Sequence, residues 1–323
     1  MQQRSLPWQT DAAARSLSNI AALRNRASPQ FWDDYAAYSV TFPSLAPGFG
    51  ATQTLQFAAD STFEWVTAVA GELVSSTPGS ITTPANGPLG LFQITDAGAG
   101  RNLLNVSSPL ASIAGTATFP HVLPIARRFV PKSQITFNLV NLDSALTLTS
   151  TQFTMQGRKL FAPGGRRDMF QKSPISRFNQ WTGQDGKLYA EDWYSYTFAF
   201  PAIAAGATVT TTVIIEQDAD FEWVMTSIAG NPRNATTGNN TSVATSLLQA
   251  QVTDGSYQRA LYNAPLWFPN FGGIGQTPFI LPQSRIFEAR TPVIMAITNP
   301  DSVAYNLLYV TLEGRKIFQP SYA

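Results

Sequence analysis

The chain has 323 residues, which is enough for two domains of ordinary size that each bury their own core. Only 13% of its residues are charged, about half of the roughly 25% usual for soluble domains, so its surface must consist largely of small and neutral polar side chains. The formal net charge of +1 gives no reason to expect a nucleic-acid partner, and the lack of cysteine excludes disulfides, thiol nucleophiles and thiolate metal sites.

Residues 1–34 differ from the rest of the chain and are predicted to form an N-terminal arm. Apolar residues at helical spacing after Thr10 predict a short helix in this arm. Arg15, Arg24 and Arg26 would point away from its apolar side and are candidate interface residues. The arm either docks on a neighbouring subunit or packs on its own domain, and the sequence favours neither. Because the arm lacks the apolar stretch of a secretory signal and no apolar run reaches the roughly 18 residues of a spanning helix, we expect a soluble protein without a membrane partner.

From residue 35 onward the chain repeats itself at an almost constant offset of 158 positions. Phe-Glu-Trp-Val occurs at 63–66 and at 221–224, and a Gly-Arg-Lys tail occurs at 157–159 and at 314–316. This period is too long for a solenoid repeat, so each copy is predicted to be a whole domain. The predicted division is a first domain at 35–161, a linker at 162–190 and a second domain at 191–323.

Apolar and polar residues alternate along several segments of both copies, as they do in half-buried strands. Tyr38, Val40 and Phe42 alternate with Ser and Thr, and Val209 and Val213 lie on one side of a Thr-rich segment. Pro-Gly, Asp-Gly, Gly-Gly and Asn-Pro pairs mark turns between such segments. The pattern predicts an all-β chain of two tandem, similar antiparallel β-sandwiches of jelly-roll or Greek-key type, preceded by the short helical arm.

The predicted linker is basic and aromatic, and its interface candidates are Arg166, Arg167, Phe170, Arg177 and Trp181. Basic residues interleaved with aromatic ones also occur in single-strand binding segments, but here they form no dense basic run. A solvated or subunit-bridging linker is therefore favoured, with the aromatic residues as interface anchors. Two long polar loops, at 73–88 and 231–245, are further candidates for partner contacts.

Asp218, Asp220 and Glu222 are the strongest candidates for a chemical site. At positions i, i+2 and i+4 of a strand they would share one face, where they could hold Ca²⁺ or supply the acid and base of glycoside cleavage. The first copy has Thr62 at the middle position, so the triplet is incomplete there. A solvated acidic face opposite a buried aromatic face is the simpler and favoured interpretation. The triplet is a weak metal candidate, and no catalytic residue or cofactor is expected.

His121 is the only histidine of the chain. Its counterpart in the second copy is Phe279, which favours a packing position near a sheet edge over a catalytic one. A Ser-His-Asp site would need this single histidine, and no Gly-x-Ser-x-Gly sequence accompanies it.

An Asp-x4-Arg pair occurs once in each copy, as Asp96 with Arg101 and as Asp254 with Arg259. Such a pair closes a turn through a charge-assisted hydrogen bond, or its arginine reaches a neighbouring subunit. In a chain so poor in charge a duplicated pair indicates a specific role, and an internal structural pair is favoured.

The block Pro-x-x-Leu-Pro-x-x-Arg-x-Phe at 120–129 and 278–287, together with the terminal segment 309–318, resembles the virion structural proteins of tailed bacteriophages. The resemblance implies many copies of the protein in a particle, with β-sandwiches used as decoration, collar or fibre-attachment modules. It implies no catalytic residue for these motifs.

We therefore expect a structural, non-enzymatic, assembly-forming protein of a phage particle, such as a capsid decoration, minor capsid, neck, collar or fibre-attachment component. A surface with few charges favours assembly because its burial costs little desolvation. The expected partners are other copies of the chain and other virion proteins, and the expected location is the virion, after synthesis in the host cytoplasm. The alternative is a carbohydrate-binding adsorption module for a host-surface glycan, and the remote alternative is a glycoside hydrolase.

Overall fold

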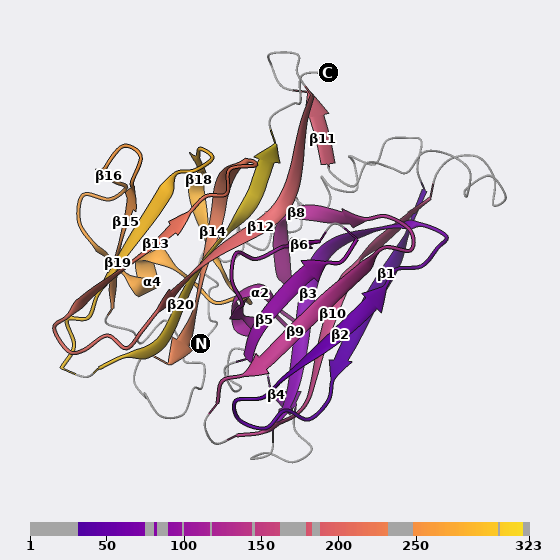
Figure 1. Ribbon diagram of the computed structural model, residues 1–323, viewed down its shortest axis with the longest axis horizontal. Coiled ribbons are helices and arrows are strands. Elements are labelled where there is room, and N and C mark those ends of the chain that lie inside the picture. The colour runs from indigo at the N-terminus through magenta and orange to yellow at the C-terminus, as the bar shows by residue number, and fades with distance from the viewer. Residues whose placement is uncertain are drawn as a thin grey trace, which may run out of the picture.

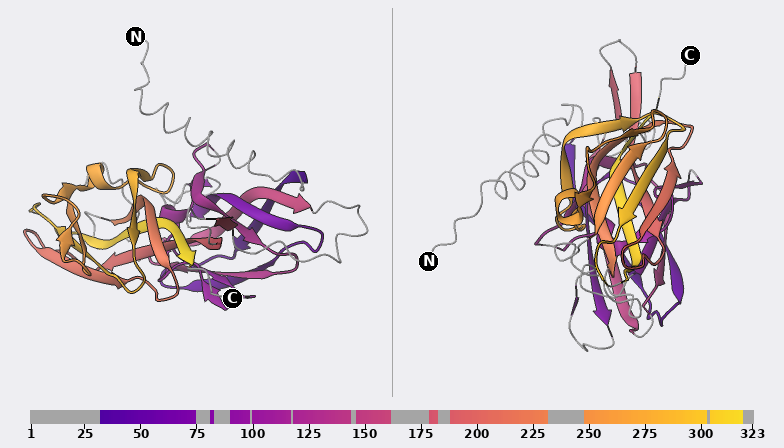
Figure 2. Two further views of the ribbon diagram at one scale, coloured as in Figure 1. Left: turned by 90° about the horizontal axis from the view of Figure 1, so that it is seen from above. Right: turned by 90° about the vertical axis from the view of Figure 1, so that its left-hand side faces the viewer.

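The computed structural model of the protein describes residues 32–74, 81–82, 90–98, 100–116, 118–143, 146–161, 179–182, 188–231, 248–302 and 304–318. This part of the chain is almost all β, and its strands form two sandwiches that lie side by side (Figure 1). They remain side by side when the molecule is seen from above (Figure 2). The prediction of tandem antiparallel β-sandwiches is confirmed. The predicted N-terminal helix lies outside the described residues.

The elements of the first sandwich are β1 (Trp32–Phe42), β2 (Gly50–Gln56), β3 (Thr62–Val74), β4 (Ile81–Thr82), β5 (Gly90–Asp96), β6 (Arg101–Asn102), β7 (Ser108–Pro109), α2 (Leu110–Ile113), β8 (His121–Phe129), β9 (Gln134–Asn141) and β10 (Leu148–Phe161). One sheet has the order β1-β10-β3, with β4 and β8 both paired to β3. The other sheet has the order β2-β9-β5, with β6 and β7 both paired to β5.

The elements of the second sandwich are β11 (Asn179–Thr182), β12 (Leu188–Phe200), β13 (Thr208–Ile214), β14 (Asp220–Asn231), β15 (Gln249–Asp254), β16 (Arg259–Ala260), β17 (Leu266–Trp267), α4 (Phe268–Phe271), β18 (Phe279–Phe287), β19 (Pro292–Thr298) and β20 (Asn306–Phe318). One sheet has the order β11-β12-β20-β14-β18. The other has the order β13-β19-β15, with β16 and β17 both paired to β15. Strands β12, β20, β14 and β18 therefore repeat β1, β10, β3 and β8.

Strand β1 begins at Trp32 and β12 begins at Leu188, a few residues before the domain starts predicted at 35 and 191. Strand β11 pairs with β12 from within the predicted linker. The ends of the predicted arm and linker thus extend the sheets, because their backbone groups find hydrogen-bond partners on neighbouring strands.

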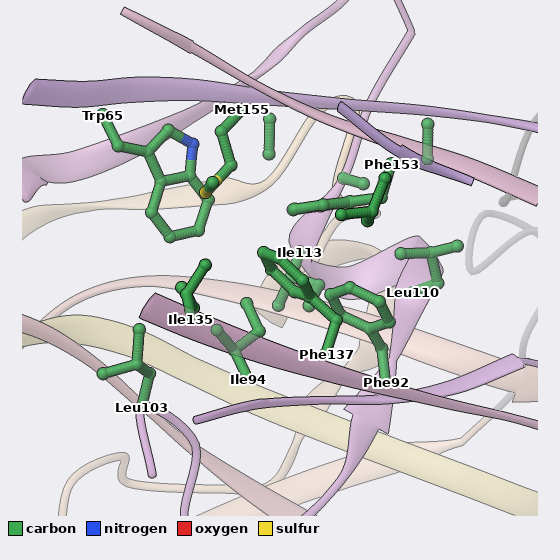
Figure 3. Packing of buried hydrophobic residues seen from close by; sticks show 14 of the residues in the cluster. Trp65, Phe92, Ile94, Leu103, Leu110, Ile113, Ile135, Phe137, Phe153 and Met155 are labelled. Atoms are coloured by element: carbon green, nitrogen blue, oxygen red, sulfur yellow. The ribbon is translucent and has the colours of Figure 1, made fainter. Parts of the chain in front are cut away.

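Aromatic residues fill the core between the two sheets of each sandwich. In the first sandwich the ring centroid of Phe92 lies 4.7 Å from that of Phe153 and 5.6 Å from that of Phe137 (Figure 3). Phe63 and Trp65 of the Phe-Glu-Trp-Val segment point into this core, as the period of two predicts. Burial of such rings is the main stabilising term in a core of this kind.

The repeated Gly-Arg-Lys tail has a steric origin. A Cβ atom on Gly157 would lie 1.9 Å from the carbonyl oxygen of Glu64, and one on Gly314 would lie 1.7 Å from that of Glu222. Only glycine allows neighbouring strands to approach so closely at these irregular positions of the ladder. The arginine that follows then binds the same glutamate, with Arg158 Nε 2.6 Å from Glu64 Oε2.

Candidate functional site at the junction of the two sandwiches

The two sandwiches meet along a continuous junction, and this junction is the candidate functional site. The first sandwich contributes strand β8, helix α2 and the segment 101–108, which we call its edge surface. The second sandwich contributes the outer sides of β12, β20 and β14, which we call its face surface. Figure 1 shows β8 and β6 beside β12 in the middle of the molecule.

Backbone hydrogen bonds tie the two sandwiches together at Leu104, which forms an isolated parallel bridge with Ser195. Ser195 N donates to Leu103 O (3.4 Å), and Asn105 N donates to Ser195 O (3.3 Å). The Asn105 side chain continues this pattern, since its Oδ1 accepts from Thr197 N (2.7 Å) and its Nδ2 donates to Thr197 O (3.3 Å). A short piece of the first sandwich therefore pairs with β12 as an added strand would.

Trp193 of β12 packs into the hydrophobic core of the first sandwich. Its ring centroid lies 5.3 Å from that of Trp65, with an interplanar angle of 68°. This edge-to-face arrangement is a favourable one for aromatic rings. The two cores are thus joined by a side chain from the second sandwich.

His121 lies fully buried at the centre of the junction. Its Nδ1 is 2.9 Å from Gly275 O, and its Nε2 is 2.9 Å from Glu313 Oε2. The other Glu313 oxygen accepts a hydrogen bond from Ser227 Oγ (3.1 Å), and Gly275 N donates to Ala111 O (2.7 Å). Because a carbonyl oxygen can only accept, Nδ1 carries a proton, and a second proton lies between Nε2 and Glu313.

Two opposing effects set the pKa of His121. Burial disfavours the charged imidazolium, but the Glu313 carboxylate outweighs burial and raises the pKa above its ordinary value of 6.5. Neither side chain is exposed, so this pair is protected from screening by solvent. His121 is therefore a structural residue that joins the two sandwiches.

A cluster of charges closes the junction beside this pair. Arg127 is only 1% exposed, and its guanidinium contacts both Asp96 (3.3 Å) and Asp192 of the second sandwich. Arg101 reaches Asp218 at 3.5 Å and Asp192 at 4.0 Å. Ion pairs buried in this way are costly to break, because a charge left behind has no water to solvate it.

The two Asp-x4-Arg pairs occupy matching places, but their charges have different partners. Asp96 and Arg101 are opposite residues of the β5–β6 hairpin, as Asp254 and Arg259 are of the β15–β16 hairpin. Arg101 forms an ion pair with Asp218 across the junction, whereas Arg259 is exposed to solvent. Asp254 instead accepts a 2.8 Å hydrogen bond from Arg285. One arginine thus reaches across to the other sandwich, and its repeat does not.

The three carboxylates Asp218, Asp220 and Glu222 do not form a ladder, because Asp218 lies in the turn before β14. Each carboxylate has its own partner: Asp218 binds Lys316 (3.0 Å), Asp220 accepts from Ala289 N (2.8 Å) and Glu222 binds Arg315. Within the described ranges no group of three His, Cys, Asp or Glu side chains is placed to hold a metal ion. Asp220 and Glu222 are thus engaged within the second sandwich, whereas Asp218 binds both Lys316 and, across the junction, Arg101.

The remaining interface candidates cannot be placed in this way. Arg15, Arg24, Arg26, Arg166, Arg167, Phe170 and Arg177 lie outside the described residues, as do most of the two long polar loops. Trp181 lies on β11, and its side chain is outside the described part as well.

Sequence reasoning missed the partners of His121 and the role of Trp193. A signal was present in the repeat, because Glu313 is Gln156 in the first copy, just as His121 is Phe279 in the second. The two differences belong to one contact: the histidine and the glutamate occur together only where the sandwiches meet.

No protein-family model matches the chain, and no curated protein matches it in sequence. The solved structures to which it is similar include peptide-N(4)-(N-acetyl-β-D-glucosaminyl) asparagine amidase (8% identity, 88% of this chain and 100% of that chain, TM-score 0.33). They also include the STIV MCP (10% identity, 87% of this chain and 96% of that chain, TM-score 0.34). A third is the PBCV-1 virus capsid (9% identity, 90% of this chain and 98% of that chain, TM-score 0.36). Viral capsid proteins are thus among the structural neighbours, but at these values the likeness carries no conclusion about function. Within the described residues, no helix has the length and apolar character needed to cross a membrane.

Proposed function

We propose that this protein is a structural, assembly-forming component of a viral particle, and more narrowly of a phage particle, as a capsid, neck, collar or fibre-attachment protein. The junction is the observation that carries the proposal. It holds two similar sandwiches in one fixed relation through buried ion pairs, each of which costs about 3–5 kcal/mol to break. A rigid subunit with two similar units suits a shell or ring built from repeated contacts.

The exposed side of the β1–β10 sheet supports assembly. Its outward residues are mostly uncharged, with Ala37, Ser39, Thr41 and Gln152 exposed to solvent beside the aromatic Tyr35. Burying neutral polar groups that can hydrogen-bond costs far less than burying charges. Such a surface suits permanent contacts with other copies of the chain and with other virion proteins in the virion.

We propose no catalytic role. Asp218, Asp220 and Glu222, the strongest candidates for acid–base chemistry, are engaged in ion pairs and hydrogen bonds of the second sandwich and, for Asp218, of the junction. His121, the only histidine, is bonded at both ring nitrogens inside the junction. These contacts support a structural use of the groups that an enzyme would need free.

Quantitative mass spectrometry of particles purified on a density gradient tests the proposal. We expect the chain to sediment with the particles in many copies per particle. If it stays in the soluble fraction of the lysate, the proposal is wrong. Binding of that soluble chain to a glycan array would then favour the adsorption module.

A further inference from the structure

The junction uses only one edge surface and one face surface, although the repeat supplies two of each. The second edge surface comprises β18, α4 and the segment 259–266, and the second face surface comprises the outer sides of β1, β10 and β3. We propose that these two surfaces bind each other between copies, so that the second sandwich of one copy docks on the first sandwich of the next. The inference rests on the proposed function and names its partner, a second copy of this chain.

The second edge surface is uncovered at the positions that the junction buries in the first. In the first sandwich Ala111, Ser112 and Arg127 are at most 2% exposed. Their counterparts are open to solvent: Pro269 and Asn270 are exposed, and the Arg285 side chain is 39% exposed. An edge built like the covered one is therefore available for the same kind of contact.

The second face surface is likewise open to solvent at positions whose counterparts are covered at the junction. Thr197 Oγ1 lies 3.0 Å from Thr311 Oγ1 beneath the junction. The corresponding pair in the first sandwich, Ser39 Oγ and Thr154 Oγ1, forms a 2.8 Å hydrogen bond that is exposed. Tyr35, the counterpart of the fully buried Trp193, is 70% exposed. A large aromatic side chain so exposed is the kind of residue that anchors an interface.

The chemistry of the two free surfaces is complementary. At the junction Arg127 binds Asp192, and the corresponding residues of the free surfaces are Arg285 and Asp34, both open to solvent. At the place of the His121–Glu313 pair, the free surfaces carry Phe279 and Gln156. The contact between copies would thus keep an arginine–aspartate pair and replace the buried histidine–glutamate pair by uncharged side chains, and a core depleted of charge is usual for an interface.

This contact joins two different surfaces and is therefore heterologous. Copies would add head to tail, and the rotation between the two sandwiches decides whether the chain of copies closes into a ring or continues as a filament. The contact between copies would resemble the junction within a copy, so the sandwiches would be arranged almost uniformly around the assembly.

A pair of arginine substitutions tests the proposed surface. Ser39→Arg places a charge and a long side chain in the centre of the free face surface. Thr52→Arg makes a comparable change at an exposed position of β2, on the other sheet of the same sandwich. Light scattering after size-exclusion chromatography should show closed oligomers or filaments for the parent and for Thr52→Arg, and monomer for Ser39→Arg at the same concentration. If Ser39→Arg assembles as the parent does, or if the parent is monomeric, the inference is wrong.

A second experiment moves the chemistry of the junction into the contact between copies. Phe279→His combined with Gln156→Glu should recreate the His–Glu pair there. We expect the double variant to assemble about tenfold more weakly at about pH 9 than at about pH 6, while parent assembly changes little. The single variant Gln156→Glu should assemble more weakly than the parent at both pH values, because its carboxylate would face the apolar ring of Phe279. If the double variant shows the same assembly at the two pH values as Gln156→Glu, the proposed pairing is contradicted. Circular dichroism of each variant is the control for folding.

The two proposals can fail separately. A chain found in purified particles that remains monomeric alone, and whose Ser39→Arg variant enters particles normally, would retain the proposed function and refute this contact. A chain that forms oligomers sensitive to Ser39→Arg but is absent from particles would retain the contact and refute the proposed function.

Discussion

Glu72 of β3 is fully buried, and within the described residues neither of its carboxylate oxygens has a hydrogen-bond partner. Burial raises its pKa from an ordinary 4.5 to about 8, so Glu72 is uncharged at neutral pH. Between these two values the unfolded carboxyl group releases its proton while the folded one keeps it. The free energy of unfolding should therefore fall as pH rises, by about 1.4 kcal/mol per pH unit from this residue.

Glu72→Gln should remove this dependence, because glutamine has nearly the same shape and no titrating group. The variant should match the parent near pH 4 and exceed its unfolding free energy near pH 8, as measured by urea titration followed through tryptophan fluorescence. Glu288→Gln, at an exposed position, is the control and should change the unfolding free energy little. Equal pH dependence in the parent and in Glu72→Gln would contradict the buried, protonated state.

The His121–Glu313 pair has a pH dependence that arises differently. Since Glu313 raises the pKa of His121, the pair contributes its full stability below about pH 6.5, the ordinary pKa of histidine. This contribution is lost as pH rises through the pKa of His121 in the folded protein. Glu313→Gln should lower the unfolding free energy by about 3 kcal/mol near pH 6 and by clearly less near pH 9. Calorimetry at both pH values measures this difference. The same loss of unfolding free energy at both pH values would mean that no proton is shared between the two side chains.

At the scale of the strand, Gly314 shows how one backbone contact fixes a whole motif. Gly314→Ala would bring Cβ into the carbonyl oxygen of Glu222, so β20 and β14 would have to separate. We expect a loss of about 1–3 kcal/mol in unfolding free energy, the usual cost of overpacking. Gly98→Ala is the matched control, because its Cβ would lie 3.5 Å from the nearest atom. A Gly314→Ala variant as stable as the control would contradict the close approach of the strands.

Strand faces could be predicted because they depend on a local period. Phe63 and Trp65 occupy alternate positions, and this alone indicates which side is buried. The acidic triplet was interpreted less well, since β14 begins at Asp220 and leaves Asp218 in a turn. Strand ends depend on where hydrogen-bond partners stop, which the local sequence does not state.

The junction could not be predicted because its contacts are distant in the sequence. His121 and Glu313 are 192 positions apart, and a polar pair gives no apolar pattern to indicate that it is buried. The comparison of His121 with Phe279 favoured a packing position, and in the structure both ring nitrogens of His121 have partners inside the junction. It did not show that one edge surface is covered and its repeat is open, since that depends on how whole sandwiches pack.

For the whole molecule, the junction makes two repeated sandwiches into one unit. Backbone pairing at Leu104, the buried His121–Glu313 pair and the insertion of Trp193 act along the same surface. Two domains that share buried surface in this way are expected to unfold together, because opening either one exposes the junction of the other. The parent should therefore give a single calorimetric transition.

Trp193→Ala tests this coupling, because it removes the side chain that joins the two cores. We expect a loss of about 3–5 kcal/mol, the usual cost of truncating a buried aromatic side chain. We also expect the single transition to separate into two, since each sandwich keeps its own core. Trp267→Ala is the control, because Trp267 is 41% exposed and takes part in none of the junction contacts described above. One cooperative transition in Trp193→Ala would mean that the polar contacts alone couple the sandwiches, whereas two transitions in the parent would refute the rigid unit on which assembly depends.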